Sequence, residues 1–259
     1  MMTDILVEKM REWRIGEGKC DGPVVLGISG GKDSSVVAAL LVKALGKENA
    51  LGVLMPNGTQ ADIGDSHDLC KVLGLYNITV DIQNAVAGLV DAIPVFSHFK
   101  LASDLSRFST NIPPRIRMTA LYAVAQRYGG RVINTTNAAE AYVGYGTLFG
   151  DTCGDFAPIR NLFVDEVIDL GLALGLPKRF VEKPPADGLT GKTDEEVLGF
   201  TYADVKKVAL DLKPRSIKPE SELAIRRKHM ESEFKRKILN VPSIDFHRDQ
   251  YGDILDIKD

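Results

Sequence analysis

The sequence has few cysteines and no pattern that pairs them. Its three cysteines, Cys20, Cys70 and Cys153, are far apart, and no C-x-x-C or Cys/His spacing joins them. No cysteine-based metal site is indicated. We expect each cysteine to be a buried free thiol, because unpaired cysteine is among the residue types most often found in protein interiors.

Long apolar runs and a strong net charge are also missing. The first ten residues lack the apolar region of a signal peptide, and no stretch approaches the roughly 18 apolar residues of a membrane-spanning helix. A formal net charge of −3 and a pI near 5.9 give no overall electrostatic reason to bind nucleic acid or an anionic membrane. We therefore expect a cytoplasmic protein whose partner is a small molecule.

What the chain does have is apolar content and a regular order of elements. Of its 259 residues 44% are apolar, enough for one sizeable core, so we expect a single domain over residues 1–259. Short apolar runs typical of strands occupy 24–28, 51–56, 77–82 and 130–136, with a further short one near 156. Helical patterns occupy 34–45, 62–74, 84–96, 115–129 and the segment before Pro177. This alternation predicts an α/β fold with a Rossmann-like, doubly wound parallel sheet of about five strands.

Two segments break this pattern. Residues 181–199 are rich in proline, glycine and charge, which is typical of a long loop that is either functional or disordered. If the loop is functional, we expect it to be a lid. Residues 213–237 carry nine Lys or Arg against four Asp or Glu. A solvated helix face is the ordinary explanation of such a charge run, and contact with RNA is the alternative.

The stretch "LGISGGKDSSV" at 26–36 fits two chemistries. A serine hydrolase would place Ser29 on a nucleophile elbow, but several strands precede the elbow in that fold, and only about two dozen residues precede Ser29 here. A Walker A loop fails because Leu26 stands where glycine is needed and Asp33 where Ser or Thr is needed. The dinucleotide-binding motif G-x-G-x-x-G is excluded as well. Its second glycine would fall on Ser29 if the motif began at Gly27, and on Lys32 if it began at Gly30.

A pyrophosphate-binding loop remains. Gly30 and Gly31 allow a tight turn whose N–H groups point at an anion, and the following helix N-terminus adds positive dipole. The hydroxyls of Ser29, Ser34 and Ser35 can donate to phosphate oxygens. Asp33 would repel a bare phosphate, so its presence indicates bound Mg²⁺. Simple capping of the helix by Asp33 or Ser34 is the alternative.

With this loop the chain resembles the N-type ATP pyrophosphatases, and more closely the ammonia-dependent NAD synthetases. The likeness runs from about residue 28 to residue 246. It is carried, in order, by "MPNGTQAD" (55–62), "NIPPRIRMTALYAVA" (111–125), "NTTNAAEA" (134–141), "FGDTCGDFAPI" (149–159), "PADGLTGKTDEEVLGFTY" (185–202) and "FKRKILNVPSIDF" (234–246).

The resemblance implies a role for individual residues. The implied ATP-binding residues are Gly27, Ile28, Ser29, Gly30, Gly31, Lys32, Asp33, Ser34, Ser35 and Thr135. Asp33 and Glu140 are implied to hold Mg²⁺. The implied contacts to deamido-NAD are Arg115, Asp155 and Lys235. Asp33 and Asp151 are the implied catalytic residues, with Asp151 near the path of ammonia.

Four positions depart from the family pattern. Many members have lysine, lysine, a hydroxyl residue and histidine where this chain has Leu148, Val164, Ala186 and Phe234. The residues that could supply the missing charge are Lys183, Lys192 and Arg236.

The implied reaction is the ATP-dependent amidation of deamido-NAD to NAD through an acyl-adenylate, with release of AMP and pyrophosphate. No segment corresponds to a glutaminase domain, so free ammonia is the expected nitrogen donor. The resemblance also implies a homodimer with the dinucleotide site near the subunit interface. Two alternatives stay open: a tRNA-modifying pyrophosphatase of the same fold, and a nucleotide-binding module that has lost catalysis.

Overall fold

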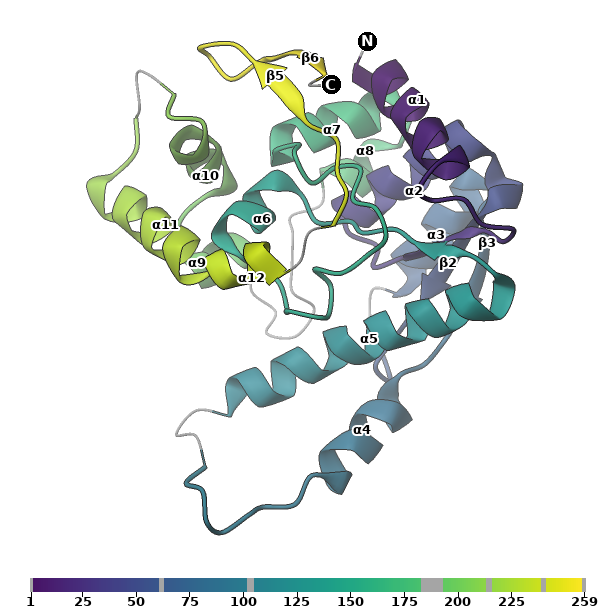
Figure 1. Cartoon of the computed structure of the whole chain (residues 1–259), viewed down its shortest axis with the longest axis vertical. Coiled ribbons are helices and arrows are strands. Elements are labelled where there is room, and N and C mark those ends of the chain that lie inside the picture. Colours follow the sequence, from purple (N-terminus) through teal and green to yellow (C-terminus); the bar gives the residue numbers. More distant parts are fainter. Residues whose placement is uncertain are drawn as a thin grey trace.

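A four-stranded parallel sheet forms the centre of the molecule (Figure 1). The structure, a computed structural model, describes residues 2–60, 63–101, 105–182, 193–212, 216–238 and 241–257. The strands are β1 (Val24–Gly27), β2 (Ala50–Leu54), β3 (Tyr76–Thr79) and β4 (Arg131–Val132), in the order β3-β2-β1-β4. A parallel bridge from Ile133 to Phe156 adds a loose fifth strand beyond β4. The predicted α/β fold with about five parallel strands is confirmed.

Helices cover both faces of this sheet. One face carries α1 (Met2–Ile15), α2 (Lys32–Leu45), α3 (Ile63–Leu73), α7 (Val164–Ala173) and α8 (Lys178–Val181). The other carries α4 (Gln83–Ala92) and α5 (Ser106–Tyr128). Side chains alternate accordingly: Val24 and Leu26 pack on the first side and Val25 on the second. Because both faces are covered at the centre of the sheet, β1 and β2 consist of apolar residues and glycine, whereas the outer strands β3 and β4 include Asn77, Thr79 and Arg131.

A second group of helices lies beside the sheet and has its own apolar cluster, which includes Phe163, Phe200 and Ile225. These helices are α6 (Ala138–Val143), α9 (Asp194–Leu198), α10 (Tyr202–Ala209) and α11 (Pro219–Glu231). The remaining elements are the 3-10 turn η1 (Lys47–Asn49), α12 (Glu233–Ile238) and the antiparallel pair β5 (Phe246–Arg248) and β6 (Ile254–Ile257).

Some sequence expectations differ from the structure. Only Cys70 is buried, whereas Cys20 and Cys153 are half-buried, because they lie in loops at the ends of the sheet rather than in a helix against it. Helix α5 begins at Ser106, inside a stretch expected to be irregular, and continues through Pro113 and Pro114. The amphipathic helix α1 is an element that the strand and helix patterns did not predict; its Trp13 stacks on Phe156 with ring centroids 4.8 Å apart.

The expected lid and basic segment are described only in part. Residues 183–192 of the lid lie outside the described residues, and its last part forms α9 with a capping box at Thr193. The basic segment, of which 213–215 lie outside the described residues, forms α11 and α12. Several of its charges pair along the helix surface, as Arg226 does with Glu222 and Lys237 with Glu233. This pairing agrees with a solvated helix face.

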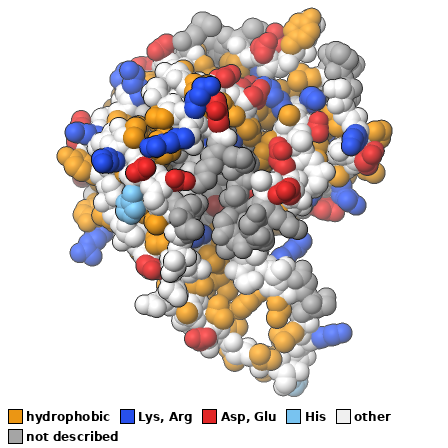
Figure 2. Space-filling view, turned by 180° about the vertical axis from the view of Figure 1, so that it is seen from behind, with side chains coloured by type: hydrophobic (Ala, Val, Ile, Leu, Met, Phe, Trp, Pro, Cys, Tyr) orange, Lys and Arg blue, Asp and Glu red, His pale blue; other side chains and the backbone are white. Residues whose placement is uncertain are grey.

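Helix α4, the following segment and the first half of α5 project from the body as an arm (Figure 1). Figure 2 shows hydrophobic side chains gathered on this projection with few charges among them. The exposed apolar side chains of the arm are Leu89, Val90, Ile93, Val95, Phe96, Phe99, Leu101, Leu105 and Phe108. Among the described residues, no helix combines the length and the apolar character that crossing a bilayer requires.

Candidate functional site

The site lies where the strand order reverses. From β1 the chain proceeds to β2 and β3 on one side, while β4 lies on the other side of β1. In an open parallel sheet the loops that leave two such strands diverge to opposite faces and open a crevice at the carboxyl ends. Here the loop at 28–31 follows β1, and the segment 133–137 follows β4. Both parts of the predicted ATP site therefore meet at this crevice.

The loop after β1 has the geometry of an anion cradle. Gly30 has a φ of +77°, and a Cβ there would lie 3.1 Å from the Ser66 hydroxyl, so a larger residue would be strained and crowded at this position. Gly31 is the N-cap of α2, and no side chain caps this helix. The alternative that Asp33 or Ser34 serves as a simple cap is therefore wrong. The uncapped first turn can present its N–H groups to a phosphate.

The three serine hydroxyls are not equivalent. Ser29 Oγ and Ser34 Oγ lie 3.0 Å apart and line a cavity, and the Gly31 N–H donates to Ser29 Oγ at 3.2 Å. Ser35 is fully buried and donates to the Gly31 carbonyl at 2.8 Å. Ser34 Oγ also donates to this carbonyl, at 3.1 Å, so Ser34 and Ser35 both shape the turn, while Ser29 and Ser34 line the cavity.

A network of charges lies behind this loop. Lys32, 3% exposed, places Nζ 2.8 Å from Asp33 Oδ2. Asn137 Nδ2 donates to the other Asp33 oxygen at 3.2 Å, and the Asn137 backbone N–H donates to Glu140 Oε2 at 3.0 Å. Asn137 Oδ1 in turn accepts from the N–H groups of Ala139 and Glu140, which completes a capping box on α6. Asn137 therefore ties the start of α2 to the start of α6 and brings Asp33 towards Glu140.

The electrostatics of this network suit a divalent cation. Burial and the nearby Asp33 carboxylate raise the pKa of Glu140 well above its usual value. Burial lowers the pKa of Lys32, but Asp33 and Glu140 outweigh it and leave that pKa raised, so Lys32 stays charged. No group of three or more His, Cys, Asp or Glu side chains gathers among the described residues. Two carboxylates are what Mg²⁺ typically takes from a protein when phosphate oxygens and water complete its shell, so Asp33 and Glu140 fit this ion.

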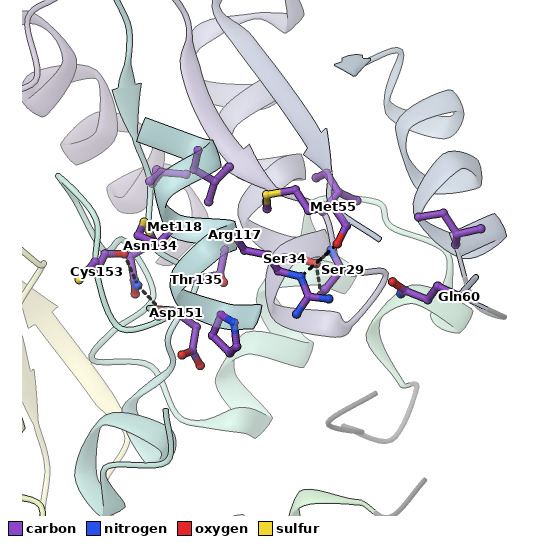
Figure 3. A pocket seen from close by; sticks show the side chains of 16 residues that line it. Ser29, Ser34, Met55, Gln60, Arg117, Met118, Asn134, Thr135, Asp151 and Cys153 are labelled. Atoms are coloured by element: carbon purple, nitrogen blue, oxygen red, sulfur yellow. Dashed lines mark hydrogen bonds between the residues drawn. The ribbon is translucent and has the colours of Figure 1, made fainter. Parts of the chain in front are cut away.

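A cavity of about 220 Å³ opens from the loop towards α5 (Figure 3). Its wall is largely apolar and includes Ile28, Met55 and Met118. The polar residues in the wall are Ser29, Ser34, Gln60, Arg117, Asn134, Thr135 and Asp151. A mostly apolar pocket with a few convergent polar groups is typical of small-molecule sites.

Arg117 and Asp151 are the charged residues of this wall. Arg117 Nε donates to the Met55 carbonyl at 3.0 Å, and burial lowers the pKa of its guanidinium despite the nearby Asp151. Asp151 is an exposed residue, but its carboxylate lies at the cavity, where Oδ1 accepts the Thr147 N–H at 2.7 Å and burial raises its pKa. Figure 3 shows Arg117 beside Ser29 and Ser34, and Asp151 on the side of Thr135 and Asn134. The phosphate loop, Thr135 and Asp151 therefore share one cavity.

The three residues expected to contact the dinucleotide do not line this cavity. Arg115 is exposed, and its Nε donates to the Leu148 carbonyl at 3.1 Å. Asp155 accepts from the Tyr122 hydroxyl at 3.2 Å and from the Val132 N–H at 2.8 Å. Lys235 lines a second, small cavity together with Glu140. Within one copy of the chain these residues do not form a single cluster.

Asn137 and Arg117 are site residues that the sequence motifs did not single out. The spacing in "NAAE" at 137–140 is that of a capping box and is a usable signal for Asn137. Arg117 follows Arg115 by two positions on α5, so the two point in different directions. Sequence alone does not say which of the pair faces a cavity.

The departures from the family pattern are also placed by the structure. Leu148 offers only its carbonyl to Arg115, Val164 is the first residue of α7, and Phe234 is 52% exposed. Ala186, Lys183 and Lys192 lie outside the described residues.

The reversal of strand order and the glycine-rich loop at a helix N-terminus are features of a nucleotide-binding α/β protein. The chain belongs to the NAD synthase family, whose model matches residues 10–250. It is 41% identical to the NH(3)-dependent NAD(+) synthetase of Methanococcus aeolicus, with 80% of this chain and 81% of that protein covered. It is 36% identical to the NH(3)-dependent NAD(+) synthetase of Thermococcus kodakarensis, with 86% and 85% covered.

Solved structures give the same family. The structure of NMN synthetase from Francisella tularensis superposes with a TM-score of 0.80 at 33% identity, covering 93% of this chain and 97% of that one. The NH3-dependent NAD synthetase from Campylobacter jejuni superposes with a TM-score of 0.73 at 28% identity, covering 90% and 94%. These matches favour NAD synthetase chemistry over a tRNA-modifying enzyme of the same fold.

Proposed function

We propose that this chain joins ammonia to the carboxylate of deamido-NAD, using ATP, and releases NAD, AMP and pyrophosphate. The observation that carries the proposal is the convergence of the phosphate loop, the Asp33 and Glu140 carboxylates and Asp151 at one crevice, in a member of this family. In the first step the substrate carboxylate attacks the α-phosphorus of ATP, and in the second ammonia attacks the acyl-adenylate. Neither step needs a nucleophile from the protein.

The residues of the loop act on the phosphate chain of ATP. The N–H groups of the first turn of α2, with Ser29 and Ser34, would bind the pyrophosphate portion, and Thr135 would position the remainder in the cavity. Asp33 and Glu140 would hold Mg²⁺, which when bound neutralises negative charge on the departing pyrophosphate. The largely apolar wall limits water near a labile adenylate.

Asp151 would receive the ammonium ion. Its carboxylate lines the same cavity as the loop, and its raised pKa brings it closer to the range in which a carboxylate can accept a proton. We propose that Asp151 binds ammonium and helps remove the proton that ammonium must lose before it attacks. Arg115, Asp155 and Lys235 remain our proposed contacts to the dinucleotide.

The direct test combines purified protein, ATP, Mg²⁺, ammonium and deamido-NAD, with separation of products by chromatography. We expect NAD, AMP and pyrophosphate in equal amounts, and none of them without ammonium beyond slow loss of adenylate. Formation of ADP and phosphate, or ATP binding without NAD formation, would overturn the proposal. The second outcome would identify a binding module without catalysis.

A second candidate differs in the size of the substrate. The likeness to an NMN synthetase, at 33% identity over nearly the whole of both chains, favours testing the mononucleotide as acceptor. Replacement of two expected lysines by Leu148 and Val164 removes cations that a second phosphate would use. Comparing kcat/KM for nicotinic acid mononucleotide and deamido-NAD decides between them. If kcat/KM is higher for nicotinic acid mononucleotide than for deamido-NAD, the protein acts as an NMN synthetase.

We also propose that two copies pair through the arm formed by α4 and the start of α5. Val95 and Phe99 are each 75% exposed there, and a continuous apolar projection of this kind is unusual on a monomer. Replacing Val95 and Phe96 together by serine should convert a dimer to a monomer in light scattering coupled to gel filtration. A monomeric parent protein would contradict the pairing.

A further inference from the structure

A second, small cavity adjoins the proposed metal-binding side chain Glu140. Its wall is formed by Thr136, Glu140, Ala141, Gly144, Thr152, Arg160, Lys235 and Arg236. Three cations therefore face one opening, from the segment before α7 and from α12. Its volume of about 20 Å³ is room for one water-sized group, such as a single phosphoryl oxygen.

Arg160 is the unusual member of this group. Its Nη1 is buried and makes no hydrogen bond, and no ion pair joins its guanidinium to a carboxylate in the part of the chain that the structure describes. A buried guanidinium N–H left without an acceptor is costly, and native structures contain few such groups. The atom therefore indicates an acceptor that belongs to a ligand.

The two other cations have partners, but these are neutral. Lys235 Nζ donates to the carbonyls of Gly144 at 2.8 Å and Gly146 at 2.6 Å. Arg236 Nη1 donates to the Tyr142 carbonyl at 2.9 Å and to Ser232 Oγ at 2.8 Å. Carbonyl and hydroxyl dipoles hold these two side chains in place without cancelling their charge.

Carboxylates offset part of this positive charge, since Glu140 lines the same cavity, Asp151 attracts Lys235 and Glu233 attracts Arg236, but none of them acts on Arg160. Burial, followed by the neighbouring Arg236, lowers the pKa of Arg160. Burial also lowers the pKa of Lys235, and this outweighs the attraction of Asp151. Both shifts mean that the protein without its ligand disfavours these charges, which an anion in the cavity would reverse.

We propose that Arg160, together with Lys235 and Arg236, forms a subsite for a phosphoryl oxygen of a substrate, next to the Glu140 carboxylate. A guanidinium N–H forms a strong charge-assisted hydrogen bond to a phosphate oxygen, and a site with room for one oxygen leaves the rest of the phosphate outside the opening. The role rests on the proposed function, because the phosphate comes either from ATP, as pyrophosphate, or from the nucleotide that carries the carboxylate. Arg160 thereby supplies a cation in a chain that has Leu148 and Val164 where relatives have lysine.

The test compares Arg160→Met with wild type, because methionine keeps much of the apolar stem and removes the charge. Calorimetry with inorganic pyrophosphate and Mg²⁺, and separately with deamido-NAD alone, distinguishes the two sources of phosphate. We expect a 10- to 100-fold weaker binding of one of these ligands, partial recovery in Arg160→Lys, and no change in the other. Arg127→Met, at an exposed position near the end of α5, is the matched control.

Thermal melting provides a readout that does not depend on activity. Without ligand, Arg160→Met should melt at or above the wild-type temperature, because it removes a buried charge that lacks a partner. The responsive ligand should raise the melting temperature of wild type and raise that of the variant much less. Equal binding of both ligands by wild type and variant would overturn the subsite, even if wild type makes NAD. Arg160-dependent pyrophosphate binding in a protein that makes no NAD would leave the subsite intact and overturn the proposed function.

Discussion

Two charged clusters meet at Glu140 and differ in how their charges are balanced. Around the phosphate loop, Lys32 pairs with Asp33 at 2.8 Å, and Asn137 bonds the other oxygen of Asp33. Around the small cavity, Arg160, Lys235 and Arg236 gather without an ion pair to any carboxylate of the described residues. We call the first the balanced cluster because Asp33 has an ion-pair partner in Lys32, and the second the unbalanced cluster because its three cations form no ion pair among the described residues.

The difference separates two ways in which this protein can hold a phosphate chain. In the balanced cluster, binding depends on backbone N–H groups and on Mg²⁺, so its own charges serve mainly to fix the positions of Asp33 and Glu140. In the unbalanced cluster the ligand itself must supply the missing charge. The first should therefore be needed for folding as well as catalysis, and the second for ligand affinity.

Asp33→Asn should have the largest effect, because it removes a charge from the balanced cluster and a ligand from the proposed metal site. We expect NAD formation to fall by about 10²- to 10³-fold, the size typical of losing a group that stabilises transition-state charge. Rates measured over a range of Mg²⁺ concentrations would test it. Asp169→Asn, at an exposed position on α7, should behave as wild type. Full activity of Asp33→Asn would refute the metal assignment.

Lys32→Met should destabilise the fold, since breaking a buried ion pair leaves the Asp33 charge without its partner. We expect the free energy of unfolding to fall by about 3 kcal/mol in urea titrations. Lys237→Met removes an exposed pair and should change it by less than about 1 kcal/mol. Arg160→Met should not lower the free energy of unfolding, because Arg160 has no ion-pair partner whose charge its removal would leave buried and unpaired. If Lys32→Met and Arg160→Met destabilised the protein equally, the contrast between the two clusters would fail.

The sequence predicts the balanced cluster better than the unbalanced one. The run at 24–28, the two glycines and Asp33 are adjacent in the chain, so local rules place the loop between a strand and a helix. Thr135 and Glu140 follow β4, and a parallel sheet brings the ends of neighbouring strands together. The fold class and the position of the loop therefore follow from the amino-acid sequence alone.

The unbalanced cluster does not follow from the sequence in this way. Arg160 and Arg236 are 76 residues apart by the numbering, and they meet because the helices beside the sheet pack on their own apolar cluster. No hydrophobic periodicity in the sequence predicts that packing. Likewise, which of Arg115 and Arg117 faces the cavity depends on where α5 lies on the sheet, which long-range contacts decide.

Arg117→Lys should have an intermediate effect that extends the comparison to the apolar cavity. Arg117 lies in the wall next to the loop, and its Nε is held by the Met55 carbonyl, so the terminal nitrogens of its guanidinium can contact an anion. Lysine keeps the charge and loses the fork, and we expect kcat/KM to fall by about 10- to 100-fold. Steady-state rates with ATP and with the acidic substrate varied in turn would show which one Arg117 contacts. Arg127→Lys is the control, and equal rates in both variants would remove Arg117 from the site.

Asp151→Asn should have the smallest effect, a change in how stability depends on pH. It tests the comparison directly, because Asp151 lies between the two clusters. Its pKa is raised in the folded protein by burial, so its contribution to stability is complete below about pH 3.8 and is lost as the pH rises through the folded value. Asp151→Asn imitates the protonated acid, and the variant should gain stability relative to wild type as the pH rises from about 4 towards 7. Urea titrations across this range measure the difference. If Asp151 instead balanced the charge of Lys235, its pKa would be lowered, and the variant would lose stability relative to wild type over the same range. That result would mean that the protein neutralises the cationic cavity itself, which would remove the reason to expect an anion from a ligand there.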